Sequence, residues 1–442
     1  MTADSGLRKV LGSAGLTSLG IGGTIGTGIF VMVGTAARDV AGPAIIVSFL
    51  IAALACGCAA LCYARLAARF PEAGSAYAYA RALTSPAKAF LVGWNLLLQY
   101  MLAAASIAQG WAHYLQDSLQ AMFGVSLPSL PVNLPAFMAV VVICIALLFG
   151  IRLSAGVNHA IVAIKLGVIA LVLIAGIQHI NPAHWAHFAP FGWGGFTLPF
   201  LGAGGPPLGM LAGAGIVFYA FLGFEALTNY SEESKAPQKD VPRSILVSLG
   251  ICTLLYMAMA TVLTGMVPYN TLSKDAPISA AFGQLGMPWV RTLVGVGALV
   301  GISSVLLVIL LSLPRVLMAI SRENILPGDL LSQTNKYGSP SSATLIGGGL
   351  VALLTAFVPL DALGVAAVMA NIVTFLVVAA LSLRIGLPDK VTPVATFLLC
   401  GLLLCSLPWF GWIVLAVWWL LGAGIYGIRH SKAKQHPSPS VT

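Results

Sequence analysis

The chain has 442 residues, of which 59% are hydrophobic and 8% charged, and its formal net charge is +9. Soluble domains carry roughly 25% charged residues because their surfaces face water, so this composition excludes a cytosolic enzyme, and the non-repeating glycines and prolines exclude a fibrous chain. A mean hydropathy of +0.96 instead predicts an all-α membrane protein with several spans.

About twelve runs are apolar and long enough to cross a membrane, since a spanning helix needs about 20 apolar residues. In chain order they lie near 16–37, 43–66, 88–113, 134–151, 157–179, 208–231, 244–267, 290–320, 340–360, 361–386, 391–408 and 409–428. The first run has no cleavage site, so we expect no removable signal peptide. No loop between the runs is long enough for a separate folded domain, and we expect a single membrane domain.

Lysine and arginine indicate the orientation, because cytoplasmic loops carry an excess of both. With the N-terminus inside, 18 of the 22 basic residues lie on the inner side, and Arg38, Lys274 and Arg291 lie on the outer side. We therefore expect an integral protein of a bacterial inner membrane with cytoplasmic tails at 1–15 and 429–442. The positive charge then contacts lipid headgroups and not nucleic acid.

Glycine interrupts two of the expected spans. Five of the nine residues from Gly20 to Gly28 are glycine, and each costs about 1 kcal/mol relative to alanine inside a helix. The sixth span carries Gly213, Gly215 and Gly223 around the aromatic run 218–221. These spans are the first members of two successive sets of five, a pattern that indicates a transporter built from inverted repeats. The alternative is that the glycines only allow close helix packing.

A broken helix exposes main-chain N–H groups at the start of one half and carbonyl groups at the end of the other. The N–H groups and their partial positive charge suit a carboxylate, whereas the carbonyl groups suit an ammonium. Two broken helices side by side therefore predict a site for a zwitterion such as an α-amino acid.

Two charged residues, Lys165 and Glu225, lie well inside spans. A charge at mid-membrane costs about 2.5–3.5 kcal/mol on insertion scales, so it needs a partner or a function. Lys165 is a candidate for binding and releasing a proton; the alternative is that it extends towards the interface. Glu225 either titrates, satisfies unwound main chain, or pairs with a cytoplasmic arginine.

Neither a disulfide framework nor a metal site is indicated. All seven cysteines lie in apolar runs and are interpreted as packing residues. His179, His184 and His187 share an outer loop, which we interpret as solvated and not as a metal site. We expect no cofactor.

Several motifs occur in a fixed order along the chain. They are GIGGTIGTGIF (20–30), PEAGSAY (71–77), VGWNLLLQY (92–100), VNHAIVAIK (157–165), FYAFLGFEA (218–226), SEESKAP (231–237), and the stretch from Pro314-Arg315 to RENILP (322–327). Over about 16–386 the chain resembles the amino acid–polyamine–organocation superfamily, in particular bacterial relatives of the cationic amino acid transporters. The resemblance implies a LeuT-like fold with inverted repeats at 16–179 and 208–386, discontinuous helices one and six, and two extra helices within 387–428.

The resemblance also implies roles for single residues. Main-chain N–H groups of Gly26, Thr27 and Gly28, with the Thr27 hydroxyl, would bind the substrate carboxylate. Main-chain carbonyl groups would bind the ammonium, from Thr24, Tyr219, Ala220 and Leu222. The rings of Tyr219 and Phe221 would form part of an aromatic lid or wall. Lys165 would couple transport to protons, with Ser303 and Ser304 as its neighbours.

Two positions depart from the superfamily pattern. Gln99 stands where close relatives carry a glutamate, and an amide neither titrates nor attracts a cationic side chain. The amide at Gln99 therefore favours small or apolar neutral amino acids over arginine and lysine as substrates. Arg322-Glu323-Asn324 stands where relatives have Arg-Asp-Gly, so the turn glycine is lost.

We predict a proton-coupled permease for L-α-amino acids that works by alternating access. An obligate amino acid exchanger would use the same site, and a carrier of cationic amino acids or polyamines is a second alternative. A membrane enzyme or receptor is a third, but the sequence contains no catalytic cluster at membrane depth to support it.

Overall fold

The computed structural model describes residues 11–70, 75–128, 131–150, 155–195, 207–321, 326, 331, 333–335, 339–386 and 389–435. Residues 71–74 of the PEAGSAY motif and the Arg322-Glu323-Asn324 departure lie outside this part. Within it, eight helical stretches are long and apolar enough to cross a membrane, and three shorter helices are also apolar. The chain is therefore an all-helical membrane protein.

The helices contain most of the described residues. In chain order they are α1 (Ser13–Thr24), α2 (Val33–Ala36), α3 (Ile45–Arg69), α4 (Ser75–Leu83), α5 (Pro86–Phe123), α6 (Leu134–Leu148), α7 (Ala155–Ile177), α8 (Met210–Val217), α9 (Pro237–Met266), α10 (Pro277–Gln284), α11 (Pro288–Ser321), α13 (Ser341–Phe357), α14 (Leu360–Arg384), α15 (Val391–Cys405) and α16 (Phe410–Gln435). Wide π-helical turns flank α2, at Gly28–Met32 and Ala37–Ala41, and 3-10 turns follow α8, at Phe218–Phe221 and Phe224–Glu233.

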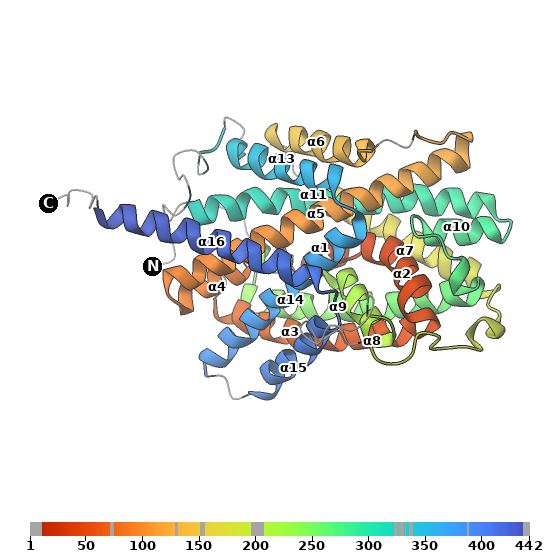
Figure 1. The fold of residues 1–442 in the computed structure, drawn as a ribbon, viewed down its shortest axis with the longest axis horizontal. Helices are drawn as coiled ribbons and strands as arrows, with labels where there is room; N and C mark the ends of the chain where they lie inside the picture. The colour runs from red at the N-terminus through yellow and green to blue at the C-terminus, as the bar shows by residue number, and fades with distance from the viewer. Residues whose placement is uncertain are drawn as a thin grey trace.

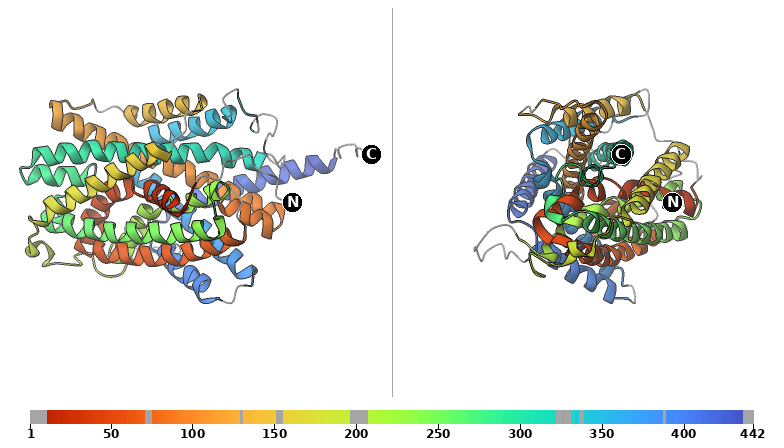
Figure 2. Two further views of the ribbon diagram at one scale, coloured as in Figure 1. Left: turned by 180° about the vertical axis from the view of Figure 1, so that it is seen from behind. Right: turned by 90° about the vertical axis from the view of Figure 1, so that its right-hand side faces the viewer.

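The long helices run along one axis of the molecule, with α4 near one end and α10 at the opposite end (Figure 1). The further views place α6 and α13 along one edge of the bundle and α15 along the opposite edge (Figure 2). The most apolar stretch of α5 is 89% buried and that of α16 only 17%. Because lipid contacts replace protein contacts at the periphery, α5 is a central helix and α16 an outer one. α1 lies inside and packs against α7, α9 and α11.

The expected spans coincide with helices to within several residues, with three differences. α5 continues to Phe123 instead of ending near 113, because its last turns bind neighbouring outer segments through Asp117. The short helices α4 and α10 were not expected; α4 is buried from Ser75 to Ala80 and exposed at Arg81. α16 continues to Gln435, so the first part of the expected tail at 429–442 is helical.

Candidate functional site

The first span is interrupted just after Thr24. α1 ends there, Ile25 adopts an extended conformation with ψ 102°, and the helix resumes with Thr27 as the cap of the turn Gly28–Met32. The first N–H groups of a helix have no partner one turn earlier, and the last carbonyl groups have none one turn later. The interruption therefore presents donors from one half-helix and acceptors from the other.

The second interruption follows α8. The 3-10 turn Phe218–Phe221 leads to Leu222, which is extended with ψ 136°, and then to Gly223, whose φ of +109° lies in the left-handed region. A side chain is strained in that region, which explains why glycine occupies this position. The chain then continues as the turn Phe224–Glu233.

The two interruptions touch main chain to main chain. A Cβ atom added to Gly28 would lie 2.3 Å from Ala220 Cα, and one added to Gly223 would lie 2.5 Å from the carbonyl oxygen of Gly23. Any larger residue would push the two segments apart. The glycines at these positions therefore serve a close approach as well as a break in each helix.

A space of about 20 Å³ lies between the two interruptions. Residues of both interruptions line it together with apolar residues of α5 and α11. They are Gly23, Thr24, Gly26, Thr27, Gly28, Tyr219 and Leu222, and Ala103, Ile107, Val305 and Ile309. The volume is about that of one water molecule, so an amino acid enters only if the surrounding helices move apart. None of the described lining residues is charged.

Two hydroxyl groups lie at this space. Thr27 Oγ1 is buried and has no hydrogen-bond partner, and the Thr27 residue is 1% exposed. The Tyr219 hydroxyl shares a hydrogen bond of 2.6 Å with the Ser106 hydroxyl of α5. A buried hydroxyl without a partner is costly, so Thr27 is a group that a bound ligand would satisfy.

Lys165 of α7 binds the end of α1. Its side chain is fully buried, and Nζ donates hydrogen bonds to the carbonyl oxygens of Gly22 at 2.6 Å and Ile25 at 2.8 Å. The ammonium therefore points into the bundle and not towards the interface. Because Ile25 is the residue at which the helix breaks, Lys165 holds the shape of the interruption directly.

Glu225 is also buried, and its partners are neutral. Oε1 accepts from Gln99 Nε2 at 2.9 Å and from Asn371 Nδ2 at 3.1 Å, and Oε2 accepts from the main-chain N–H of Gly223 at 3.0 Å. The side chain of Gln99 in turn accepts from the Thr374 hydroxyl at 3.0 Å. Of the alternatives for Glu225, the structure favours satisfaction of unwound main chain; the described partners include no arginine.

Other expected site residues lie near the interruptions but face elsewhere. Phe221 packs against Phe49 and Tyr256, with ring centroids 6.3 Å and 5.3 Å away, and does not line the space. Gln99 is likewise outside the lining and belongs to the Glu225 cluster. The carbonyl oxygen of Thr24 already accepts a hydrogen bond from the Tyr256 hydroxyl at 2.9 Å.

The two expected neighbours of Lys165 on α11 differ from each other. Ser303 Oγ accepts a hydrogen bond from Trp111 Nε1 at 2.9 Å, so it faces α5 instead of Lys165. Ser304 is buried and donates to the carbonyl oxygen of Gly301, and Gly301 packs against the Lys165 stem. The expectation for Ser303 was wrong in direction because adjacent residues of a helix face different neighbours.

Sequence reasoning missed three groups that complete the site. Tyr256 was overlooked because a tyrosine in an apolar run normally indicates core packing, and Ser106 because a serine fits into a helix without cost. Asn371 did carry a signal, since it is a lone amide within the span 361–386, and polar residues inside a membrane usually have a partner.

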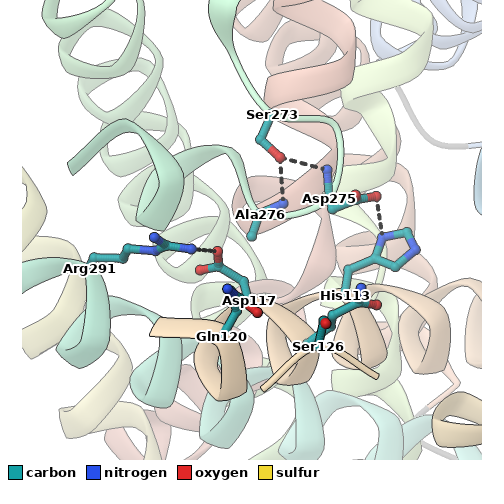
Figure 3. Close-up of a pocket in the computed structure, with 9 residues that line it drawn as sticks. His113, Asp117, Gln120, Ser126, Ser273, Asp275, Ala276 and Arg291 are labelled. Atoms are coloured by element: carbon teal, nitrogen blue, oxygen red, sulfur yellow. Dashed lines mark hydrogen bonds and ion pairs between the residues drawn. The ribbon is translucent and has the colours of Figure 1, made fainter. Parts of the chain in front are cut away.

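The outer end of the bundle contains a separate polar cavity of about 440 Å³ (Figure 3). Figure 3 shows Asp117 of α5 pointing at Arg291 of α11, and His113 pointing at Asp275, with 3.3 Å between His113 Nδ1 and Asp275 Oδ1. None of its lining residues lines the space at the interruptions. These contacts join the ends of α5, α10 and α11 on that side.

The opposite end is joined through the first described residue. Leu11 N–H donates to the carbonyl oxygen of Glu233 at 3.0 Å, and Lys235 N–H donates to the carbonyl oxygen of Leu11 at 2.9 Å. The segment before α1 is thereby held to the loop after the second interruption.

Comparison with known proteins agrees with this architecture. The family model described as "Amino acid permease" matches residues 11–428. The chain is 36% identical to the branched-chain amino acid permease BcaP of Bacillus subtilis, over 98% of this chain and 96% of that protein. It is also 36% identical to the methylthioribose transporter of Bacillus subtilis, over 96% and 94% of the two chains. A third relative, mouse cationic amino acid transporter 4, is 36% identical over 81% of this chain and 57% of its own.

Proposed function

The chain belongs to the amino acid permease family of the amino acid–polyamine–organocation superfamily, and from this premise we propose that it takes up small or apolar neutral L-α-amino acids together with protons, by alternating access. Membership makes it a multi-pass membrane protein for amino acid transport and not an enzyme. The substrate range, the coupling ion and the site residues are our proposal.

The proposal is carried by the contact between the two interruptions. Gly26, Thr27 and Gly28 stand at the start of the outer half of the first span, where N–H groups and the helix dipole favour a carboxylate. The unpartnered Thr27 hydroxyl adds a donor to the same place. Across from it, carbonyl groups of Ala220 and Leu222 are suited to an ammonium. A zwitterion satisfies both sets at once.

The side chain of the substrate would lie against Ala103, Ile107, Val305 and Ile309. These walls are apolar, and apolar pockets select by size and by the absence of polar groups. The nearby carboxylate of Glu225 is already bound by Gln99, Asn371 and Gly223. A cationic side chain would therefore find no free acidic partner there, which favours neutral substrates such as alanine, valine and leucine.

Lys165 is proposed to couple this site to protons. A protonated Lys165 holds the carbonyl groups of Gly22 and Ile25 and so keeps the end of α1 in its bent form. A neutral lysine has one donor fewer and binds them more weakly. Loss of the proton then favours movement of α1 away from α7, which would open the site towards the cytoplasm.

The proposed architecture has twelve spans in a five-plus-five inverted repeat with both termini in the cytoplasm. The stretch Gly28–Arg69 contains the outer half of the first span and all of the second, and α6, α13 and α15 are the shorter spans. Interruptions at the first and sixth spans support the repeat. α15 and α16 would be the two helices outside it.

Transport by purified protein in liposomes tests the proposal. We expect leucine to accumulate when the outside is acidic, and Lys165→Ala to abolish that accumulation while Lys88→Ala, an exposed lysine at the start of α5, leaves it intact. Arginine, putrescine and methylthioribose should compete at least about tenfold more weakly than leucine, because they lack the neutral zwitterion or its apolar side chain.

Three results would contradict parts of this proposal. Full accumulation by Lys165→Ala would remove the lysine from coupling. Uptake that requires amino acid inside the liposomes, whatever the proton gradient, would establish an exchanger. Stronger competition by arginine or methylthioribose than by leucine would refute the neutral substrate class.

A further inference from the structure

One face of α7 lies against α1 at Gly22. Asn158, Val162 and Lys165 are spaced four and three residues apart, so they share this face, and all three are buried. A Cβ atom added to Gly22 would lie 2.9 Å from Val162 Cγ2 and 3.2 Å from Asn158 Oδ1. The carbonyl oxygen of Gly22 also accepts from Lys165. The same peptide of α1 thus contacts a lysine and an asparagine.

Asn158 is unsatisfied in this position. The residue is 4% exposed, and its Nδ2 has no hydrogen-bond partner among the residues that the structure describes. Ser18 Oγ, one helical turn before Gly22 on α1, is buried without a partner in the same way. Buried polar groups without protein partners are usually satisfied by ordered water. Ser18 lies four residues before Gly22 and so shares the face of α1 that meets α7 at Gly22. The two groups therefore point to a hydrated passage along the α1–α7 contact.

The position of Asn158 indicates that this passage would lead from Lys165 towards the cytoplasm. α7 begins at Ala155, and Asn158 lies in its first turn, at the end that the proposed orientation assigns to the cytoplasm. Lys165 is seven residues further along, about 10 Å deeper at 1.5 Å per residue. Asn158 therefore lies between Lys165 and the cytoplasmic end of the helix.

We propose that Asn158 is a positioning residue for proton release: its carboxamide, together with the Ser18 hydroxyl, holds water through which the Lys165 proton reaches the cytoplasm. The Lys165 N–H bond breaks and its electron pair stays on Nζ, while the proton adds to a water oxygen and moves on to bulk water. Asn158 donates to that oxygen and takes no proton itself. This inference rests on the proposed function.

The charged and titratable groups around the passage are few. From α9, Cys252 and Tyr256 face the end of α1, and the Tyr256 hydroxyl donates to the carbonyl oxygen of Thr24. α11 meets Lys165 with Gly301, and α1 contributes no ionisable side chain between Ser13 and Thr24. His159 follows Asn158 on α7 but lies on an exposed face. Because few titratable groups face the passage, water is the proposed acceptor of the Lys165 proton.

Replacement of Asn158 in liposome-reconstituted protein tests the inference. Asn158→Leu keeps the number and branching of the side-chain heavy atoms and removes the donor, and we expect at least a tenfold fall in kcat for proton-driven leucine uptake with KM changed less than twofold. Asn158→Ser, which leaves room and a hydroxyl for water, should restore kcat to within threefold. Asn158→Val serves as the second apolar variant if Asn158→Leu does not fold, as judged by its melting temperature.

Val162→Ala is the matched control, because it alters packing on Gly22 without altering a polar group; its kcat should stay within threefold. Dependence of kcat on the internal pH is the second readout: the apolar variants should lose it, whereas wild type and Asn158→Ser retain it. An unchanged kcat in both apolar variants, or an equal fall in Val162→Ala, overturns the inference.

The same assay separates this inference from the proposed function. If wild type shows no proton-driven uptake, both fall. If wild type is coupled and Lys165→Ala is not, but the apolar Asn158 variants behave as wild type, only the passage is refuted.

Discussion

Two glycines bring the interrupted spans together, and each does so through its main chain. At Gly28 the neighbour is the backbone of Ala220, and at Gly223 it is the carbonyl oxygen of Gly23. Such contacts place main-chain donors and acceptors from two helices within reach of one small ligand. A side chain at either position would separate the two interrupted spans, so the site depends on the absence of a side chain at Gly28 and Gly223.

Gly223→Ala tests this dependence at a single position. Alanine in the left-handed region costs about 1–2 kcal/mol, and its methyl group would also meet Gly23. We expect leucine uptake to fall at least about tenfold, since 1.4 kcal/mol corresponds to a factor of ten. Gly250→Ala on α9, where an added Cβ meets nothing within 4 Å, should leave uptake unchanged. Equal uptake by the two variants would show that the close approach is unimportant.

The residue types at the site could be predicted, but the directions of several side chains could not. Lys165 and Glu225 were identifiable because lipid does not tolerate an unpaired charge. Phe221 and Gln99 were assigned by their place in a motif, and Ser303 by its place on the eighth span. Each of them faces a neighbour that depends on the rotation of its helix. That rotation is set by tertiary packing, which no local pattern encodes.

At the scale of the elements, α16 is attached to the core helix α5 through a reciprocal pair of tryptophans. Trp94 Nε1 donates to the carbonyl oxygen of Trp418, and Trp418 Nε1 donates to that of Trp94, both at 2.8 Å. The rings stack with centroids 4.5 Å apart. Because lipid is as apolar as the protein interior, helix association here relies on packing and hydrogen bonds. This pair supplies both.

Trp418→Ala should weaken the attachment of α16 without changing the site. It removes one indole donor and one stacked ring, a loss of about 1–3 kcal/mol, and should lower the melting temperature in detergent. Uptake per folded molecule should stay within about twofold, because the site lies on other helices. Trp409→Ala, an exposed residue just before α16, is the control and should melt as wild type does. A loss of uptake at unchanged stability would instead give α16 a part in transport.

A second attachment joins α3 to the segment before α15 and depends on pH. Asp389 accepts from the Thr392 hydroxyl and from Arg65, and these bonds hold the pKa of its carboxyl well below the usual range. An ordinary aspartate has a pKa near 3.9 when unfolded. The stabilisation is therefore complete above about pH 4 and is lost as the pH falls from there towards the lower folded value.

Asp389→Asn should consequently melt below wild type at pH 7, and the gap should narrow as the pH drops from about 5 to 3. Melting curves across this range measure it. Asp240→Asn at the start of α9 is the control for loss of one surface carboxylate. A gap that stays constant to pH 3 would mean that the Asp389 contacts stabilise the protein through geometry and not through charge.

Hydropathy predicted element boundaries well where no distant polar contact extends a helix. α7 and α14 match their expected spans closely. α5 extends further because its last turns bind Ser279 and Arg291 across more than 150 residues of sequence. α4 was missed because, with 9 residues, it is too short to form a spanning run.

At the scale of the whole molecule, the two interruptions lie between two ends of the bundle that are each joined by polar contacts. Polar contacts join the outer ends of α5, α10 and α11, and main-chain bonds of Leu11 join the inner end. The space between the interruptions is only about 20 Å³, too small for an amino acid. Under the proposed alternating access, the contacts at one end would release while those at the other persist.

Binding of truncated substrates tests the central claim most directly. A ligand that binds only the folded protein raises its stability by RT ln(1 + [L]/Kd), so melting temperatures in the presence of ligands report affinity. We predict that leucine raises the melting temperature, whereas 3-methylbutylamine, without the carboxylate, and 4-methylpentanoate, without the ammonium, do not at tenfold higher concentration. If either truncated compound stabilises the protein as well as leucine, main-chain groups at the two interruptions do not bind both ends of a zwitterion.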